Sequence, residues 1–154
     1  MKHQKIEAGI EFTKEDLGAR TSQGEYCIAK VLQYMGWDFV TEFYQDPNNK
    51  RNSPRFDFYF VYKGQKFLIE YNGFQHFGIC DYSPSLEDLK AQKQKDKAKR
   101  KWAKSKGYKI INFNVRTDSA DYTKIYNETR ITPVKVFSAV EKLLKSDRQV
   151  IDIE

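Results

Sequence analysis

The feature that most constrains this chain is a pair of aromatic-rich segments joined by Lys63 and Gly64, with the sequence FDFYFVYKGQKFLIEYN over residues 56–72. Aromatic and branched apolar residues at this density favour strands. Gly64 supplies the positive φ that a tight reversal requires. The segment therefore predicts a β-hairpin, with strands over residues 56–62 and 65–72, in which Asp57 stands directly opposite Glu70.

The two acids of this hairpin form an unusual pair. Alternation along the strands places them on one face and leaves the other face to four large apolar side chains: Phe58, Phe60, Phe67 and Ile69. Facing side chains have Cβ atoms roughly 5 Å apart, so like charges there are destabilising. Such carboxylates need protons or a cation, and their hard oxygens suit Mg²⁺. The alternative is a solvent-facing pair that is bridged to nearby lysines.

A helix is predicted over residues 22–35, ahead of the hairpin. Ser22-x-x-Glu25 has the form of a capping box. Apolar residues then recur at helical spacing up to Gly36: Ile28, Val31, Leu32 and Met35. Glu25 lies on the buried stripe of this helix, where it either reaches back to its own helix N-terminus or serves as a third carboxylate aimed at the sheet.

The segments around this helix are less informative. Residues 37–44, WDFVTEFY, alternate as a strand does, and residues 45–55, QDPNNKRNSPR, are dense in turn-forming residues and predict an exposed loop. In that loop Arg51 and Arg55 either contact a phosphate backbone or are simply solvated. Residues 1–20 carry a thin helix signal at Thr13-x-x-Asp16, and we assign them no function.

A strongly basic helix is predicted after the hairpin, over residues 85–107. Residues 90–106 carry nine basic side chains against one acid, Asp96, an excess larger than the net charge of +6 of the whole chain. This pattern is typical of a polyanion binder, with a solvated helix face as the alternative. A narrow apolar strip is expected to pack on the sheet: Leu86, Leu89, Ala91, Ala98 and Trp102. Asp96 either pairs with Arg100 or Lys93, or belongs to a functional site.

The last third of the chain completes an α/β pattern. Residues 108–115, YKIINFNV, predict a strand that is reached from the hairpin by a helical crossover and is therefore parallel to the strand carrying Glu70. A loop over residues 116–131 precedes a C-terminal helix over residues 132–145, and residues 146–154 either add an edge strand or stay loose. We expect a single domain with a mixed four-stranded sheet, flanked by helices in the order αβββαβ.

Composition narrows the setting of the protein. No apolar run approaches the roughly 20 residues of a membrane span, and the first residues lack the apolar centre of a signal peptide. Cys27 and Cys80 have no CxxC spacing, so neither a disulfide nor a zinc site is expected. These features predict a cytoplasmic protein.

Two stretches carry a resemblance to a known family: RFDFYFVYKGQKFLIEYNGFQHF at residues 55–77 and KDKAKRKWAKSKGYKIINFNV at residues 95–115. With Glu25 and the αβββαβ order, the chain resembles the PD-(D/E)XK nuclease superfamily, in particular the branch related to very-short-patch repair endonucleases and to phage and homing endonucleases. The resemblance implies a restriction-endonuclease-like core whose signature acids sit on the two strands of one hairpin. It also implies a bacterial or phage-infected cell as the setting.

Residue by residue, the resemblance gives Asp57 as the first signature acid and Glu70 as the second. The signature lysine two residues after the second acid is replaced by Asn72, so Gln75 or His76 would have to take over its task. His76, Asp96 and Glu25 match a histidine, a helix acid and a first-helix acid of the repair-endonuclease branch. The resemblance implies that Asp57, Glu70 and Glu25 hold Mg²⁺, with Mn²⁺ as a substitute, that His76 accepts a proton from water, and that Asp96 orients His76.

The sequence thus predicts a Mg²⁺-dependent endonuclease acting on duplex DNA, including branched or mismatched forms, as a monomer or a homodimer. Basic side chains are expected to bind the DNA backbone: Lys93, Lys97, Lys99, Arg100, Lys101, Lys104, Arg55 and Arg51. Two alternatives stay open. One is a nuclease fold that only binds DNA, which Asn72 favours, and the other is an RNA-binding or assembly module that uses the basic helix.

Overall fold

The computed structural model describes residues 4–7, 9–18, 21–49, 55–72, 86–114 and 131–153. Its centre is a six-stranded mixed sheet whose strands follow one another in chain order. The strands are β1 (Gln4–Ile6), β2 (Phe39–Tyr44), β3 (Arg55–Tyr62), β4 (Gln65–Asn72), β5 (Lys109–Asn114) and β6 (Val150–Ile153). β1 to β4 pair antiparallel, whereas β5 and β6 continue the sheet in parallel.

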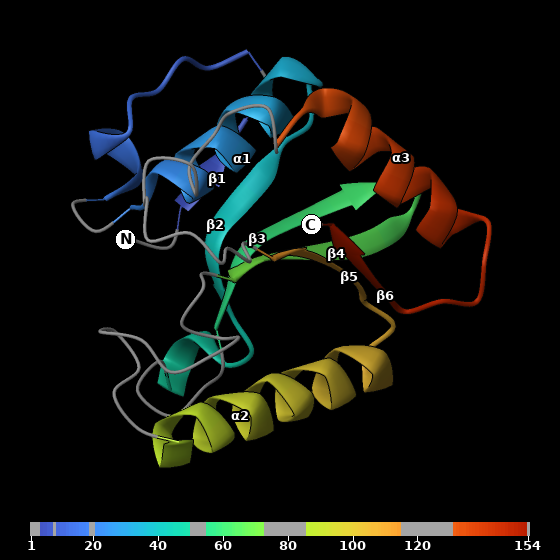
Figure 1. Cartoon of the computed structure of the whole chain (residues 1–154). Coiled ribbons are helices and arrows are strands. Elements are labelled where there is room, and N and C mark those ends of the chain that lie inside the picture. Colours follow the sequence, from blue (N-terminus) through green and yellow to red (C-terminus); the bar gives the residue numbers. More distant parts are fainter. Residues whose placement is uncertain are drawn as a thin grey trace, which may run out of the picture.

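Helices cover both faces of this sheet. α1 (Gln23–Tyr34) and α3 (Pro133–Leu144) lie on one face, and α2 (Leu86–Ser105) lies on the other (Figure 1). Two short 3₁₀ turns span Glu15–Leu17 and Pro47–Asn49. In the described ranges no helix combines the length and the apolar character that a membrane crossing requires.

The predicted α/β class and the parallel pairing of β4 with β5 are confirmed, but the four-stranded sheet is wrong. Residues 4–6 add an antiparallel edge strand beside β2, and residues 150–153 add a parallel edge strand beside β5. Both edge strands are only three or four residues long. Their partners, and not a strong local pattern, determine their conformation.

The β3–β4 hairpin has the predicted two-residue turn. Lys63 and Gly64 have φ values of 50° and 76°, as a tight primed turn requires. The ladder runs from Tyr62 opposite Gln65 to Phe58 opposite Ile69. The pairing therefore ends one residue before Asp57 and Glu70, so that the two acids stand at the open end of the ladder.

Two apolar clusters hold the layers together. The larger one lies between the sheet and the helices α1 and α3, and it contains the four side chains predicted for one face of the hairpin: Phe58, Phe60, Phe67 and Ile69. The smaller one lies under α2 and contains Phe56, Leu68, Ala103 and Ile110. Because fully burying a large apolar side chain contributes about 1.5–3 kcal/mol, both helical layers are firmly seated on the sheet.

β3 changes the face that its side chains occupy at Asp57. Phe58 packs in the larger cluster, whereas Phe56, two residues earlier, stacks on Trp102 of α2 with ring centroids 5.9 Å apart. In the neighbouring strand, Glu42 has a φ of 48°, a left-handed conformation that is uncommon for a residue with a side chain. The irregularity across β2 and β3 turns Asp57 away from the face on which simple alternation places it.

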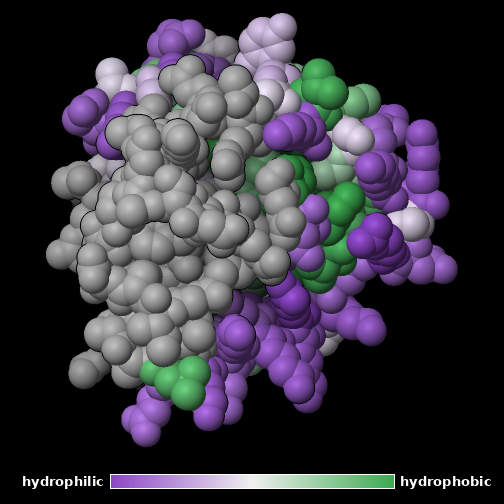
Figure 2. Space-filling model, in the orientation of Figure 1, coloured by the Kyte–Doolittle hydropathy of each residue, from purple (hydrophilic) through white to green (hydrophobic). Residues whose placement is uncertain are grey.

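The side of α2 that faces the sheet is polar over much of its length. Gln92, Asp96 and Lys99 are half-buried, and Ala103, one turn further on, is buried. Of the predicted apolar strip, Trp102 packs under the helix as expected, but Leu86, Ala91 and Ala98 are exposed. The surface over α2 is strongly hydrophilic where it is visible in Figure 2. α2 thus turns a polar strip toward the end of the sheet where Glu70 lies.

Candidate functional site

The charged side chains near the open end of the hairpin form two neighbouring groups. The first, the Asp57 group, consists of Glu25, Glu42, Arg55 and Asp57, and lies beside the N-terminus of α1. The second, the Glu70 cavity, lies under α2 and is lined by Phe56, Glu70, Asp96, Lys99, Arg100, Ile110 and Asn112. The Asp57 carboxylate acts electrostatically on both Glu25 and Glu70, and so links the two groups.

Asp57 is held where backbone pairing has stopped. Its side chain is 7% exposed, and its Oδ2 accepts the backbone N–H of Tyr71 at 2.8 Å. Arg55 Nη2 lies 3.8 Å from Asp57 Oδ1, while Arg55 Nη1 lies 3.0 Å from Oε1 of the buried Glu42. The guanidinium therefore compensates two buried carboxylates that face each other from β2 and β3.

Glu25 fulfils both roles that its position in the sequence allows. Its Oε2 accepts the backbone N–H of Ser22 at 3.0 Å, and Ser22 Oγ accepts the backbone N–H of Glu25 at 3.1 Å, which completes the capping box. The same side chain reaches Asp57. Burial, and then the negative charge of Asp57, raise the pKa of Glu25 to about 7, although the Ser22 hydrogen bond and Arg55 oppose the shift.

A glycine brings the start of α1 close to β4. A Cβ atom at Gly24 would lie 2.2 Å from Cζ of Tyr71, so any side chain at this position would meet the tyrosine ring. Gly24 precedes Glu25, and Tyr71 follows Glu70 and donates to Asp57. This contact therefore sets the distance between the helix that carries Glu25 and the strand that carries Glu70.

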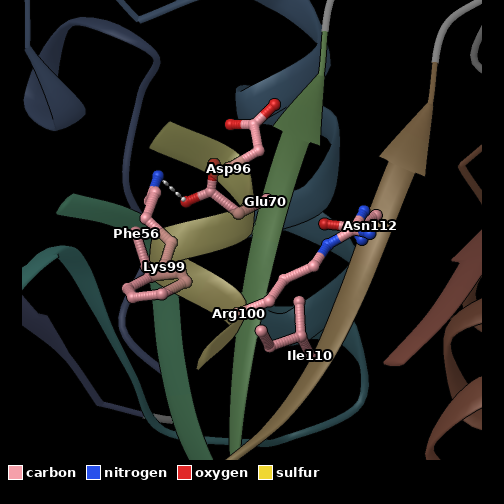
Figure 3. A pocket seen from close by; sticks show the side chains of 7 residues that line it. All are labelled: Phe56, Glu70, Asp96, Lys99, Arg100, Ile110 and Asn112. Carbon is pink, nitrogen blue, oxygen red and sulfur yellow. Dashed lines mark ion pairs between the residues drawn. The ribbon is translucent and has the colours of Figure 1, made fainter. Parts of the chain in front are cut away.

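The Glu70 cavity centres on an ion pair. Lys99 Nζ lies 3.1 Å from Glu70 Oε1, with the two side chains only 16% and 14% exposed (Figure 3). Despite this contact, Glu70 Oε1 has no hydrogen bond of good geometry within the described part of the chain. The Lys99 ammonium also lies 4.8 Å from the centre of the Phe56 ring. One oxygen of Glu70 thus retains hydrogen-bonding capacity inside a polar cavity.

Asp96 and Arg100 complete the polar wall of the cavity. Asp96 Oδ1 accepts a hydrogen bond from Gln92 Nε2 at 3.1 Å. In Figure 3 the Glu70 carboxylate lies between Lys99 and Asp96, and Arg100 extends across β4 toward Asn112. Burial first, then the charge of Asp57, raise the pKa of Glu70 to about 8, with Asp96 adding to the shift and Lys99 opposing it.

Some of the predicted site residues lie in the two groups, one lies at the end of β4, and the others lie outside the described part of the chain. Glu25 and Asp57 are brought together in the first group, and Glu70, Asp96 and Lys99 in the second. Asn72 is the last residue of β4, where it pairs with Asn114 of β5. Three predicted residues lie outside the described part of the chain: Arg51, Gln75 and His76.

The predicted DNA-binding residues also differ among themselves. Most of those on α2 are exposed: Lys93, Lys97, Arg100, Lys101 and Lys104. Lys99 is turned inward to Glu70, and Arg55 is paired with Glu42 and Asp57 although its side chain is 45% exposed. Contact of any of these residues with DNA stays a prediction.

Two features of the site escaped sequence reasoning. Glu42 becomes part of it through its left-handed backbone, for which the alternating residues 37–44 give no signal. The inward strip of α2 had a signal, because Gln92, Asp96, Lys99 and Ala103 follow the i, i+4, i+7, i+11 spacing of one helix face. The prediction followed the apolar residues of the helix, most of which lie on a different face.

The oxygen donors of the site are of the kind that Mg²⁺ prefers, namely aspartate and glutamate carboxylates. Glu70 Oε1 lies 3.1 Å from Lys99 Nζ, and Asp57 Oδ1 lies 3.8 Å from Arg55 Nη2. However, the described residues contain no group of three or more His, Cys, Asp or Glu side chains arranged to hold a metal ion. In this arrangement the cations next to Asp57 and Glu70 are Arg55 and Lys99.

Comparison of the chain with protein-family models, with curated proteins and with solved structures gave no match. No activity can therefore be carried over from a relative. A function can be inferred from the chemistry of the Asp57 group, the Glu70 cavity and the basic surface of α2.

Proposed function

We propose that this protein is a metal-dependent endonuclease of the PD-(D/E)XK type that hydrolyses phosphodiester bonds in duplex DNA. The observation that carries the proposal is the pair of carboxylates at the open end of the hairpin, the buried Asp57 and the half-buried Glu70, on which the charge of Asp57 acts. The order α1-β2-β3-β4-α2-β5 agrees with the αβββαβ core that the sequence resemblance implies. A basic helix, α2, contributes residues to the cavity that contains Glu70.

Mg²⁺, or Mn²⁺ in its place, would be held by Asp57 and Glu70, with Glu25 contributing directly or through a water. When bound, the ion would lower the pKa of a water molecule and neutralise charge on the phosphoryl group. Burial first, and then the charge of Asp57, raise the pKa values of Glu25 and Glu70, and a cation bound beside them would favour their ionised forms.

The hydrolysis needs no redox partner. The oxygen of water forms a new bond to phosphorus while the bond from phosphorus to the leaving sugar oxygen breaks. Water loses one proton and the leaving oxygen takes one up. We assign acceptance of the first proton to His76 and its orientation to Asp96, both as the resemblance implies.

The exposed surface of α2 would attract the negatively charged DNA, which the cluster of acids repels. Its exposed lysines and Arg100 present positive charge to solvent beside a cavity lined by Glu70 and Asp96. Neutralising DNA phosphates releases counterions and makes binding steeply dependent on salt. Binding through this helix is expected to have little sequence preference, because phosphate contacts position a protein without reading bases.

Cleavage of supercoiled plasmid tests the proposal. The wild-type protein should convert the plasmid to nicked or linear forms with Mg²⁺ and leave it intact with EDTA. Asp57→Asn should lose this activity, since it removes a metal-binding charge but retains a side chain that can accept the Tyr71 N–H. Equal cleavage by the wild-type and Asp57→Asn proteins would falsify the proposal.

One observation favours a second function, DNA binding without cleavage. Arg55 and Lys99 already neutralise the two central acids, and the described residues hold no three-donor metal group. A protein of this kind would bind duplex DNA in a salt-sensitive manner, and no divalent ion would produce cleavage. The same plasmid assay, repeated with Mg²⁺, Mn²⁺ and Ca²⁺ and combined with a binding measurement, separates the two functions.

A further inference from the structure

The Glu70 cavity contains a lysine whose placement differs from that of every other basic residue on α2. We propose that Lys99 is a catalytic residue, and that its ammonium binds a phosphoryl oxygen of the phosphodiester that is cleaved beside Glu70. This inference rests on the proposed nuclease function and names a further residue of the same site. The sequence predicted Lys99 to be one of several contacts to the DNA backbone, and we now assign it a role in the chemical step.

The Lys99 side chain points toward the sheet, and not into solvent. Along α2, whose residues the structure describes from Leu86 to Ser105, the other seven basic side chains are exposed, while Lys99 is only 16% exposed. Lys99 follows Gln92 and Asp96 on the strip that faces the sheet. A lysine that serves only to attract DNA from solution would gain nothing from this inward placement.

The Lys99 ammonium is held in place by contacts on two sides. Glu70 Oε1 lies 3.1 Å from Nζ, and the Phe56 ring centre lies 4.8 Å from it. Phe56 is itself fully buried under α2, where it stacks on Trp102. The position of the charge is therefore fixed by the core of the protein, which is the preorganisation that electrostatic catalysis requires.

The cavity beside Lys99 is large enough for one oxygen atom. The Glu70 cavity has a volume of about 20 Å³, and one water requires roughly 10–15 Å³. Its lining includes Glu70, Lys99, Arg100 and Asn112, and in Figure 3 Lys99 points to Glu70 while Arg100 extends toward Asn112. A single oxygen, whether from water or from a phosphoryl group, therefore has room in the cavity that Lys99 and Glu70 line.

β4 carries no basic residue at position 72. Asn72 stands two residues after Glu70 on β4, where the resemblance implies a lysine, and an asparagine cannot supply positive charge. Lys99 brings an ammonium to the same carboxylate from the neighbouring helix. The charge that β4 lacks is thus present in the site, contributed by a different element.

The chemical role follows from these contacts. As water attacks, negative charge increases on the phosphoryl oxygens, and a fixed ammonium donates a hydrogen bond to one of them. Lys99 keeps its own proton throughout, so the proton balance of the hydrolysis does not change. Removing one preorganised donor of this kind costs about 100- to 1,000-fold in rate.

The test separates the rate of cleavage from the affinity for DNA. Single-turnover cleavage with Mg²⁺ and duplex binding in EDTA would be measured for wild type, Lys99→Met and Lys99→Gln. Lys99→Met keeps the apolar stem that contacts Phe56 and removes the ammonium. We expect both variants to cleave about 100-fold more slowly or worse, with Kd changed by less than about threefold. Lys142→Gln, an exposed change on α3, is the matched control and should leave both quantities unchanged.

A rescue experiment excludes a merely structural role. Adding Asn72→Lys to Lys99→Met returns an ammonium to the neighbourhood of Glu70 and should recover at least about tenfold of the lost rate. Wild-type cleavage in the Lys99→Met protein would overturn the role of Lys99 and leave the nuclease function standing. A folded Lys99→Met protein, verified by thermal unfolding, that is slow and gains nothing from Asn72→Lys would also overturn it. A wild-type protein that never cleaves would instead overturn the nuclease function.

Discussion

The Asp57 carboxylate accepts the backbone N–H of Tyr71 at 2.8 Å, at the point where the β3–β4 ladder has ended. This hydrogen bond joins the strand that carries Asp57 to the strand that carries Glu70. It also occupies only one carboxylate oxygen, Oδ2, while Oδ1 is 3.8 Å from Arg55. A single side chain therefore closes the end of the hairpin and contributes negative charge to both groups of the site.

Two substitutions of Asp57 should separate its structural and chemical roles. Asp57→Asn can still accept the Tyr71 N–H, whereas Asp57→Ala leaves that buried donor without its acceptor. We expect Asp57→Ala to be about 1–3 kcal/mol less stable to urea than Asp57→Asn, and both proteins to be inactive. Equal stability of the two variants would show that the hydrogen bond does not hold the hairpin end together.

The metal-free protein should lose stability as the pH rises. Glu25 and Glu70 have folded-state pKa values raised to about 7 and about 8, above the ordinary value of 4.5. Between these values the folded state binds more protons than the unfolded state, so the free energy of unfolding falls with increasing pH. In EDTA we expect a decrease of several kcal/mol between about pH 5 and pH 8, because two carboxyl groups contribute to it.

Urea unfolding at several pH values measures this decrease. The double variant Glu25→Gln, Glu70→Gln is the control, because neither glutamine titrates, and its stability should depend much less on pH over the same interval. A wild-type protein that becomes more stable from pH 5 to pH 8 would contradict the assignment of both carboxyl groups.

Mg²⁺ should reverse this loss. A divalent ion binds the ionised carboxylates, so its affinity should increase as Glu25 and Glu70 lose their protons. At a Mg²⁺ concentration of about 100 times Kd, binding adds about 2.7 kcal/mol of stability. The rise in Tm on adding Mg²⁺, compared with NaCl of equal ionic strength, should be larger at pH 8 than at pH 6 and absent in Asp57→Asn. An equal rise at both pH values would indicate nonspecific binding.

The hairpin could be predicted from sequence because its determinants are local. Strand-forming residues and a turn at Lys63 and Gly64 set the register, and the register sets which residues stand near Asp57 and Glu70. The capping box of α1 is local for the same reason, and it places Glu25 in the first turn of that helix.

What the sequence did not reveal depends on contacts between distant segments. The change of face at Asp57 accompanies the left-handed conformation of Glu42, whose charge is compensated by Arg55 from the next strand. The inward strip of α2 is polar because the sheet beneath it ends in Glu70, so that a charged partner such as Lys99 packs there in place of apolar side chains. The conformation of Glu42 follows from no periodicity within its strand, and the helical spacing of the strip on α2 does not reveal that its partner on the sheet is Glu70.

Replacing Gly24 by alanine should disturb the site without touching an ionisable group. The new Cβ would lie 2.2 Å from Cζ of Tyr71, so the ring must move away from α1. Alanine favours a helix by about 1 kcal/mol relative to glycine, but overpacking costs about 1–3 kcal/mol. We expect a net loss of stability and slower cleavage, because Glu25 and Asp57 are placed by the two elements in contact.

A double-mutant cycle isolates this contact. Tyr71→Ala removes the ring. In that background Gly24→Ala should lower the free energy of unfolding only slightly, or should raise it by stabilising the helix. The coupling free energy from urea unfolding should be at least about 1 kcal/mol. Additive effects of the two substitutions would show that α1 and β4 do not depend on the close approach of Gly24 to Tyr71.

The exposed lysines of α2 should govern the salt dependence of DNA binding and leave the chemical step intact. Each phosphate contact adds about 0.9 to the slope of log K against log salt concentration. Lys97→Gln and Lys101→Gln, both on the exposed side of α2, should each reduce the slope by up to this amount and weaken binding at low salt. Single-turnover cleavage at saturating protein should stay near the wild-type rate, in contrast to Lys99→Met. Unchanged slopes in both variants would mean that DNA approaches the protein from a surface other than α2.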